Sequence, residues 1–385
     1  MKYTKNKNRT RSSGKRPVST LNPEMLVKKA TQNFVKPYVS TRDFTQLKLH
    51  QQLSKNIAQK GYSAPTEIQD KCIDHLIQGK SLIGIAATGT GKTGAFLIPM
   101  VQQMLENSAV TGLIVVPTRE LAQQVFEEFM SLTKGMGLHA ACFIGGTSIG
   151  KDISKTKRKL NLVVGTPGRL NDLIDRRALR IDRMSALVLD EFDRMLDMGF
   201  IRDIQKLVSG MHDRKQTMLF SATVDPSQEK LIKQIVQNPM RVTVSSGTKS
   251  SDNVDQDIIR VGRDENKFDR LFDLVNEPSF EKVLLFAETK RTVDKLSKQL
   301  TRSGIKSDVI HGNKSQNYRT RAIAQFKSGK TKVLVATDVA ARGIDIKGVT
   351  HVINYQLPQT MDSYIHRIGR TGRAEATGMA YTFIN

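Results

Sequence analysis

The sequence is poor in cysteine and has no long apolar run, and both shortages narrow what the protein can be. Two of its 385 residues are cysteine, Cys72 and Cys142, and neither has the spacing of a metal site or a disulfide framework. No apolar stretch approaches the roughly 20 residues that span a bilayer. The first residues are basic but lack the apolar core of a secretory signal. We therefore expect a soluble protein of the reducing cytoplasm.

Acidic residues are also scarce, because 37 Asp and Glu face 60 Lys and Arg, a formal net charge of +23. Such an excess indicates a polyanionic partner. Residues 1–42 alone carry 7 Lys and 4 Arg against one acid, Glu24. The start of the chain has no hydrophobic periodicity, so we expect residues 1–41 to form a disordered tail. Two roles stay open for it: a salt-sensitive tether to nucleic-acid backbone, or a segment that only solubilises the chain.

Short Val/Ile/Leu runs alternate with amphipathic stretches, a pattern typical of parallel α/β sheets. A polar segment without periodicity, 245–253, indicates a flexible linker between domains at 42–244 and 254–385, with no further module expected. Strands are expected near 82–87, 112–117, 161–165, 186–190, 217–221 and 241–244. A second series is expected near 257–262, 282–286, 307–310, 332–336, 351–354 and 379–384.

Residues 87–93, ATGTGKT, have the pattern of a phosphate-binding loop that follows an apolar strand. The glycines let the backbone wrap a phosphate, and the following helix presents free N–H groups to it. Lys92 would reach the β- and γ-phosphates, and the Thr93 hydroxyl would ligate Mg²⁺. Ala86 stands where the pattern has its first Gly, which weakens the match slightly. The loop residues predicted to contact nucleotide are Ala87, Thr88, Gly89, Thr90, Gly91, Lys92 and Thr93.

Asp190 and Glu191 come directly after another apolar strand. Carboxylates at the carboxyl end of a parallel strand point into the crevice where α/β sheets bind ligands. One carboxylate can hold Mg²⁺ while its neighbour manages a water molecule. Alone, such a pair also fits a helix cap or a solvated surface. Together with the loop at 87–93 it favours a nucleotide site.

The second half has no phosphate loop, but residues 364–373 carry a cluster of arginines. Arg367 and Arg370 share a helical face at i, i+3. Arginine-rich helix ends are often solvated, but fixed guanidinium groups can also stabilise a transferring phosphoryl group. If they do so here, hydrolysis requires the two domains to close.

These motifs, in this order, resemble those of DEAD-box ATP-dependent RNA helicases over roughly residues 42–385. The resemblance implies two RecA-like parallel-sheet domains, with ATP and Mg²⁺ as cofactors. In residues 61–69, GYSAPTEIQ, it assigns Gln69 to the adenine edge. Phe44, 17 residues before Gly61, would lie against the base. Glu67 replaces the proline that is usual in the family.

The resemblance also assigns roles around the nucleotide. Asp190 would hold Mg²⁺ through water, and Glu191 would position or deprotonate the attacking water. Asp193 would contact the segment 221–223 and the loop of His366, and would thereby link nucleotide state to domain closure. The other residues implied here are Arg370 and Arg373 at the γ-phosphate, Gly343 and Asp345 near the nucleotide, and Ser221, Thr223 and His366 in coupling.

Further motifs imply an RNA track of hydroxyls, backbone amides and arginines, which bind sugar–phosphate without reading bases. Recognition of the 2′-OH would favour RNA over DNA. The residues implied in the first domain are Pro117, Thr118, Arg119, Gly146, Thr166, Gly168 and Arg169. Those implied in the second domain are Thr289, Lys290, Gln316, Arg319, Thr337 and Asp338.

The function implied is ATP-dependent local separation of short RNA duplexes, or remodelling of RNA–protein complexes, by a monomer. Two alternatives stay open: an ATP-dependent RNA clamp with slow turnover, and a DNA helicase of the same superfamily. The sequence departs from the family at Phe192, where alanine is usual, and at Gln356, where an acid is usual. Neither departure removes a carboxylate from the nucleotide site.

Overall fold

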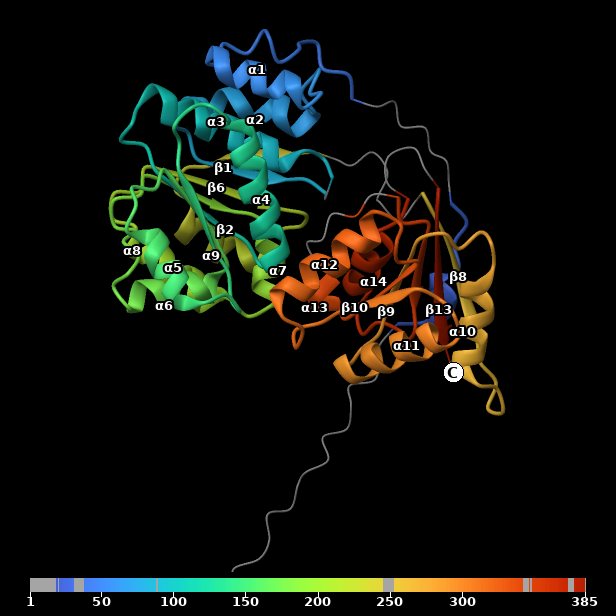
Figure 1. The fold of residues 1–385 in the computed structure, drawn as a ribbon. Helices are drawn as coiled ribbons and strands as arrows, with labels where there is room; N and C mark the ends of the chain where they lie inside the picture. Colours follow the sequence, from blue (N-terminus) through green and yellow to red (C-terminus); the bar gives the residue numbers. More distant parts are fainter. Residues whose placement is uncertain are drawn as a thin grey trace, which may run out of the picture.

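The computed structural model describes residues 19, 21–30, 38–87, 89–244, 253–341, 346, 348–372 and 377–384. Within these ranges the chain forms two domains, each built on a parallel sheet with helices packed against it (Figure 1). The two parallel-sheet α/β domains predicted from the sequence are therefore confirmed. In the described part of the chain, no helix is both long and apolar enough to cross a bilayer.

The first domain holds a seven-stranded sheet of order β3-β4-β2-β5-β6-β1-β7, in which every pairing is parallel. Its strands are β1 (Leu82–Ile85), β2 (Gly112–Val115), β3 (Ala140–Phe143), β4 (Leu162–Gly165), β5 (Ala186–Leu189), β6 (Gln216–Ser221) and β7 (Met240–Thr243). Its helices are α1 (Gln51–Gln59), α2 (Glu67–Ile77), α3 (Lys92–Glu106), α4 (Arg119–Leu132), α5 (Ile149–Thr156), α6 (Pro167–Asp175), α7 (Phe192–Asp197), α8 (Ile201–Gly210) and α9 (Glu229–Ile235), with a short 3-10 helix η2 (Pro226–Gln228).

Both faces of this sheet are buried, which explains why its inner strands read as continuous apolar runs. Successive side chains of a strand point to opposite faces. Val188 accordingly packs in the core on one face, whereas Leu187 and Leu189 pack in the core on the other.

The second domain holds a six-stranded parallel sheet of order β10-β11-β9-β12-β13-β8. Its strands are β8 (Val254–Arg260), β9 (Val283–Phe286), β10 (Ser307–Ile310), β11 (Val333–Ala336), β12 (His351–Asn354) and β13 (Gly378–Ile384). Its helices are α10 (Lys267–Asn276), α11 (Lys290–Arg302), α12 (Gln316–Lys327), α13 (Asp338–Ala341) and α14 (Met361–Ile368).

One strand is missing from the sequence prediction. β3 has the sequence Ala-Ala-Cys-Phe, lies at the edge of its sheet and is only alternately buried. Small residues carry a weak β signal, since strand propensity comes largely from β-branched and aromatic side chains.

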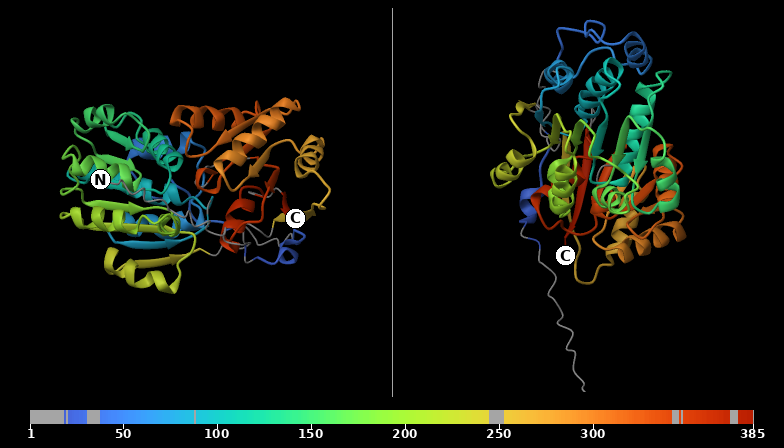
Figure 2. Two further views of the ribbon diagram at one scale, coloured as in Figure 1. Left: turned by 90° about the horizontal axis from the view of Figure 1, so that it is seen from below. Right: turned by 90° about the vertical axis from the view of Figure 1, so that its left-hand side faces the viewer.

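Residues 21–30 also differ from the disordered tail expected over 1–41. They form the 3-10 helix η1 (Pro23–Leu26) and then an antiparallel bridge from Lys28 to Gln256 of β8. Leu26 is fully buried in the core of the second domain. Figures 1 and 2 show this segment, in blue, beside the strands of that domain. The sequence pattern gave no sign of it, because a single buried leucine produces no periodicity.

Candidate nucleotide site and nucleic-acid interface

The glycine-rich loop, the acidic pair and Ser221 lie at the carboxyl ends of three neighbouring strands of the first domain. β1 leads into the glycine-rich loop, β5 into Asp190 and Glu191, and β6 ends at Ser221. The three strands are adjacent in the order β5-β6-β1. Because parallel strands end at the same edge of a sheet, this topology brings motifs that are a hundred residues apart in sequence to one crevice.

The glycine-rich loop folds closely over the start of α3. Gly91 has a left-handed backbone (φ 95°), and a Cβ there would lie 2.6 Å from the Thr66 hydroxyl. Only glycine fits this position without a shift of its neighbours. Lys92 is buried, and its ammonium donates to the carbonyl of Ala86 at 2.8 Å. The lysine is thus folded over the loop that would hold a phosphate. Thr88 lies outside the described residues.

Gln69 joins α2 to the glycine-rich loop. Its Oε1 accepts from the backbone N–H of Thr66 at 3.0 Å, and its Nε2 donates to the carbonyl of Gly91 at 3.0 Å. Phe44 is buried, with its ring centroid 6.1 Å from that of Tyr62. The amide of Gln69 is therefore fixed in place beside the loop, while the adenine contacts of Gln69 and Phe44 stay predictions.

The acidic pair occupies a strained turn between β5 and α7. Glu191 has left-handed dihedral angles (φ 53°, ψ 51°), which are rare for a residue with a side chain and are found at functional sites. Its Oε2 lies 3.2 Å from the Arg194 guanidinium. Its backbone N–H donates to the carboxylate of Asp190 at 2.9 Å. The turn therefore holds both carboxylates at the sheet edge.

Burial raises the pKa of Asp190 to about 6, against the opposing effect of the nearby Lys92 ammonium. Glu191 adds to the increase by like-charge repulsion. A buried carboxylate that is costly to ionise is stabilised strongly by a cation beside it. Among the described residues, three or more His, Cys, Asp or Glu side chains nowhere converge as a metal cage. The buried carboxylate of Asp190 at the end of β5 fits Mg²⁺, which proteins often bind through one or two carboxylates together with substrate phosphates.

Asp193 connects the acidic turn to the end of β6. Its backbone N–H donates to the Ser221 hydroxyl at 3.2 Å. Its Oδ2 accepts from the backbone N–H groups of Ala222 and Thr223, each at 3.2 Å. The structure thus brings together the predicted coupling residues of the first domain, while a contact of Asp193 with the His366 loop stays a prediction.

Phe192 points away from the site. Its side chain is fully buried in the core on the face that also holds Leu189 and Met195. The ring fills space beneath the crevice and displaces neither carboxylate.

The predicted RNA residues of the first domain occupy the other half of the same sheet edge. They follow β2, β3 and β4, which are adjacent in the order β3-β4-β2. The Thr118 hydroxyl accepts from the backbone N–H of Leu121 at 3.3 Å and caps α4. The sheet edge is therefore divided into one half that carries the predicted nucleotide residues and an adjoining half of hydroxyls, glycines and arginines.

Two arginines shape this second half. The Arg119 guanidinium lies against the glycine turn, where a Cβ on Gly146 (φ 85°) would come within 2.5 Å of it. Arg169 donates to the carbonyls of Ile144 at 3.1 Å and Thr147 at 2.5 Å. The backbone of this turn therefore contacts two guanidinium groups. Of the remaining predicted residues, Pro117 precedes the N-cap residue of α4, Thr166 is the N-cap residue of α6, and Gly168 lies in the first turn of α6.

The second domain repeats the arrangement at the ends of β9, β10 and β11, which are adjacent in the order β10-β11-β9. The Thr289 hydroxyl caps α11 by accepting from the backbone N–H of Thr292 at 3.1 Å. Lys290 donates to Asn313 at 2.7 Å. Asp338 receives both ends of the Arg367 guanidinium, at 2.5 and 2.7 Å. Thr337 lies directly before Asp338, at the carboxyl end of β11.

Gln316 and Arg319 of α12 meet the first domain rather than open solvent. The Arg319 guanidinium lies 2.8 Å from the carboxylate of Glu120 in α4, and Gln316 Nε2 donates to the same carboxylate at 3.2 Å. All three side chains are less than 9% exposed. Figure 1 shows α12 beside the first domain. Glu120 is not among the residues predicted from the sequence, since no local pattern reveals a partner about 200 residues away.

Arg370 is buried at 6% exposure, and its Nε donates to the carbonyl of His366 at 3.3 Å. Arg370 lies two residues beyond the end of α14, so it does not share a helical face with Arg367 as the sequence spacing suggested. Arg367, in the last turn of α14, donates to Asn354 at 3.0 Å. Gly343, Asp345 and Arg373 lie outside the described residues.

Comparison with known proteins gives matches in both domains. Residues 66–232 match the family model described as DEAD/DEAH box helicase, and residues 266–375 match that described as Helicase conserved C-terminal domain. The ATP-dependent RNA helicase CshA of Limosilactobacillus reuteri is 42% identical over 342 residues, covering 89% of this chain and 69% of that protein. The DEAD-box ATP-dependent RNA helicase CshA of Geobacillus kaustophilus is 43% identical, with 89% and 73% covered.

Solved structures are similar as well. A chain of S. cerevisiae Dbp5 bound to RNA and ADP BeF3 has a TM-score of 0.78 at 30% identity, with 90% of each chain covered. A DEAD box protein from the hyperthermophile Methanococcus jannaschii has a TM-score of 0.52 at 38% identity, covering 90% of this chain and 94% of that one.

Proposed function

This chain belongs to the DEAD/DEAH box helicase family, whose matched relatives are ATP-dependent RNA helicases, and we propose how its residues perform that activity. ATP and RNA together close the two domains, and closure separates short RNA duplexes locally or remodels RNA–protein complexes. The observation that carries the proposal is the divided sheet edge of the first domain. The glycine-rich loop and the acidic pair occupy one half, and groups suited to a sugar–phosphate backbone occupy the half beside it.

In the nucleotide half, Gln69 recognises adenine and Phe44 lies near the base. Lys92 moves from the Ala86 carbonyl to the β- and γ-phosphates. Glu191 orients the attacking water, whose oxygen bonds to the γ-phosphorus as the bond to ADP breaks. Arg370 neutralises the charge that develops on the transferring group. In related phosphoryl transfers, such an arginine contributes about 10³–10⁵ in rate.

Mg²⁺ would be held by the Thr93 hydroxyl and, through water, by Asp190, and it would neutralise phosphate charge. Burial raises the pKa of Asp190 and therefore disfavours its ionised form when no cation is bound. A cation beside the carboxylate would favour the ionised form, which supports this role. Asp193 links the nucleotide crevice to the end of β6 through its contacts with residues 222 and 223. A movement of the acidic turn on nucleotide binding would therefore move that segment as well. Thr88, Gly343, Asp345 and Arg373 complete the proposed nucleotide contacts.

Hydroxyls and guanidinium groups at the strand ends of both domains would hold one strand of RNA by its sugar–phosphate backbone. The residues that we propose in this track are Pro117, Thr118, Arg119, Gly146, Thr166, Gly168, Arg169, Thr289, Lys290, Gln316, Arg319, Thr337 and Asp338. Such contacts fix position and carry no base code, so the substrate is RNA of largely arbitrary sequence.

The placement of the two domains supports closure. A TM-score over both domains falls when their relative placement differs. This chain scores 0.78 against Dbp5 bound to RNA and ADP BeF3, but 0.52 against the Methanococcus jannaschii protein despite the higher identity of the latter. The present placement therefore resembles that of the RNA-bound relative, and the buried contact of Glu120 with Arg319 is made in it. We further propose that the protein acts as a cytoplasmic monomer.

The test is RNA-stimulated phosphate release by Lys92→Ala and Glu191→Gln. Both variants should lose turnover, since each lacks a group that acts on the γ-phosphate or the attacking water. Lys80→Ala and Glu265→Gln, at exposed positions, are the matched controls and should turn over normally. Near-normal activity of Lys92→Ala or Glu191→Gln would refute the assignment. Equal stimulation by single-stranded DNA would favour a DNA helicase, and tight RNA binding with little duplex separation would favour a clamp.

A further inference from the structure

Helix α11 of the second domain has an outer face made only of cations. Exposed basic residues recur along it every three or four positions and therefore form a single line. The members of this line, which we call the α11 stripe, are Arg291, Lys295, Lys298 and Arg302. Val293, Leu296 and Leu300 are buried on the opposite side of the helix, against the sheet. The stripe therefore points away from the core into solvent.

Within the described part of the chain, the stripe keeps its charge. None of its four side chains forms an ion pair with a described carboxylate. The single acid of α11, Asp294, is engaged elsewhere, because it lies 3.1 Å from His311 and 3.0 Å from the Lys314 ammonium. The positive charge of the stripe is therefore available to a partner.

This arrangement of charge opposes the stability of the helix. Like charges four residues apart destabilise a helix, and Arg291 with Lys295 and Lys298 with Arg302 are two such pairs. Positive charge is favourable in the last turn but unfavourable in the first turn, where Lys290 and Arg291 lie. A face that only keeps the protein soluble would mix charges of both signs. Folding therefore gives no reason for the stripe, whereas binding of a polyanion does.

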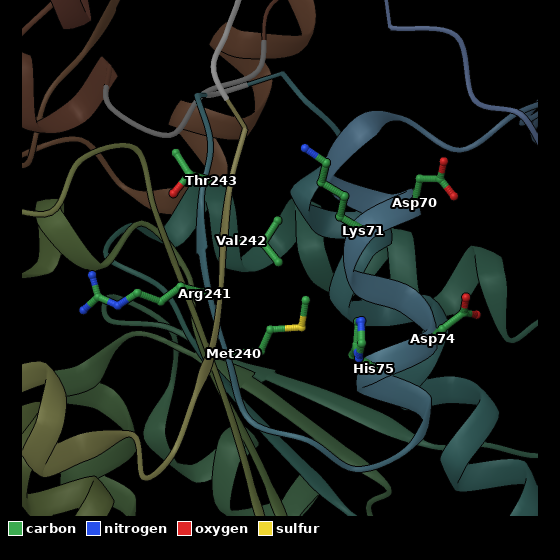
Figure 3. A pocket seen from close by; sticks show the side chains of 8 residues that line it. All are labelled: Asp70, Lys71, Asp74, His75, Met240, Arg241, Val242 and Thr243. Atoms are coloured by element: carbon green, nitrogen blue, oxygen red, sulfur yellow. The ribbon is translucent and has the colours of Figure 1, made fainter.

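The charged surface around α2 and β7 shows the mixed pattern instead. Figure 3 shows side chains of both signs around a cavity of about 380 Å³ in this place. Lys71 pairs with Glu67, one turn before it on α2, at 2.7 Å. The Arg42 guanidinium pairs with Asp70 at 2.5 Å and with Asp74 at 2.6 Å. These charges are met within the protein, so this surface does not indicate a polyanion as the α11 stripe does.

The stripe begins at the predicted RNA track. Thr289 caps α11 and Lys290 is its first residue, and both belong to the track proposed above. From Arg291 to Arg302 the helix rises about 16 Å, with about 4.5–6 Å between successive cations of the stripe. Phosphates follow one another more closely along a strand of a duplex, about every 3.4 Å. Each cation can therefore meet a different phosphate of RNA that leaves the track.

We propose that the α11 stripe is a second RNA surface, which holds the sugar–phosphate backbone of RNA that continues beyond the track. This inference rests on the proposed RNA track, because the stripe extends from it. Contacts of this kind add affinity that falls with salt and carry no base code. The stripe would thereby favour long RNAs over short ones that fill only the track.

The first test removes two charges of the stripe. Lys295→Gln/Lys298→Gln should weaken binding of a long single-stranded RNA about tenfold at about 50 mM salt. It should also lower the slope of log affinity against log salt concentration by about 1.4, since two phosphate contacts are lost. Fluorescence anisotropy of the full chain without nucleotide measures both. Lys230→Gln/Lys233→Gln on α9 is the matched control, because these lysines are also exposed and three residues apart on a helix. The control should change neither quantity.

The second test separates the charge of the stripe from its position. Lys295→Arg/Lys298→Arg keeps the charge and should bind RNA as the parent chain does. The loss in Lys295→Gln/Lys298→Gln should shrink as the RNA is shortened from about 24 to about 6 nucleotides, because short strands fill only the track.

An unchanged salt slope in the glutamine variant, or an equal loss for every RNA length, would overturn the proposal. An equal loss in the α9 control would overturn it as well, since net charge alone would then explain the effect. Absence of RNA-stimulated ATPase in the parent chain would instead count against the proposed function, because binding to the stripe is measured without nucleotide.

Discussion

Replacing Asp190 by asparagine should stabilise the protein while abolishing its ATPase activity. Burial raises the pKa of this carboxyl from 3.8 to about 6. A shift of that size corresponds to about 3 kcal/mol. Because the folded state keeps its proton where the unfolded state has lost it, the stability is fully present below pH 3.8 and is lost as the pH rises through 6. An asparagine side chain cannot ionise, so the variant escapes this loss.

The size of the effect should depend on pH in a defined way. Asp190→Asn should exceed the parent chain in free energy of unfolding by about 1.5 kcal/mol at pH 5 and about 3 kcal/mol at pH 8. Urea unfolding followed by far-ultraviolet circular dichroism, without nucleotide, measures both values. Asp213→Asn, at an exposed position of the same domain, is the control and should show no such gain. Equal stability of Asp190→Asn and the parent at pH 8, or a gain that does not grow between pH 5 and pH 8, would refute the reasoning.

Three other variants test separate parts of the structure. Glu120→Gln should leave the Arg319 guanidinium buried and uncompensated, which costs the closed arrangement about 3–5 kcal/mol. The variant should therefore need a higher RNA concentration for ATPase activity. Strictly additive effects of Glu120→Gln and Arg319→Gln in a double-mutant cycle would contradict a direct pair. Phe192→Ala should lower the free energy of unfolding by about 3–5 kcal/mol, because it empties a fully buried site; a loss below about 1 kcal/mol in urea unfolding would mean that the core closes over the space. Deleting residues 1–18 removes seven cations but keeps the buried Leu26 and the bridge of Lys28 to β8. The deletion should weaken RNA binding at low salt and flatten its salt dependence. Unchanged binding at every salt concentration would reduce that segment to a solubilising role.

Local patterns were sufficient to predict that the glycine-rich loop and the acidic pair lie at one edge of the sheet. The glycine-rich loop and the Asp190–Glu191 pair each follow a buried strand. Each pattern can be recognised within about ten residues of sequence. Parallel topology then requires their strand ends to share one edge, which the order β5-β6-β1 confirms. What the pattern could not supply is the conformation of single groups, such as the left-handed turn at Glu191 or the hydrogen bonds that fix Gln69.

Contacts between distant segments were missed for a physical reason. The partner of Arg319 is Glu120, about 200 residues away, and Leu26 packs against Val254 and Tyr364. Neither contact leaves periodicity or spacing in the sequence, because each depends on a single side chain meeting a surface built elsewhere. β3 was missed for a different reason, since its Ala-Ala-Cys core has little β propensity.

The bridge between Lys28 and Gln256 also bears on how the protein behaves in a concentrated solution. β8 is a seven-residue edge strand, and residues 28–30 cover part of its outer side. A chain truncated to begin at residue 38 would expose that edge, together with the apolar surface that Leu26 covers. Uncovered edge strands pair with one another and promote self-association. Such a truncated protein would therefore precipitate or form oligomers, and its loss of RNA binding would report aggregation rather than the removal of positive charge.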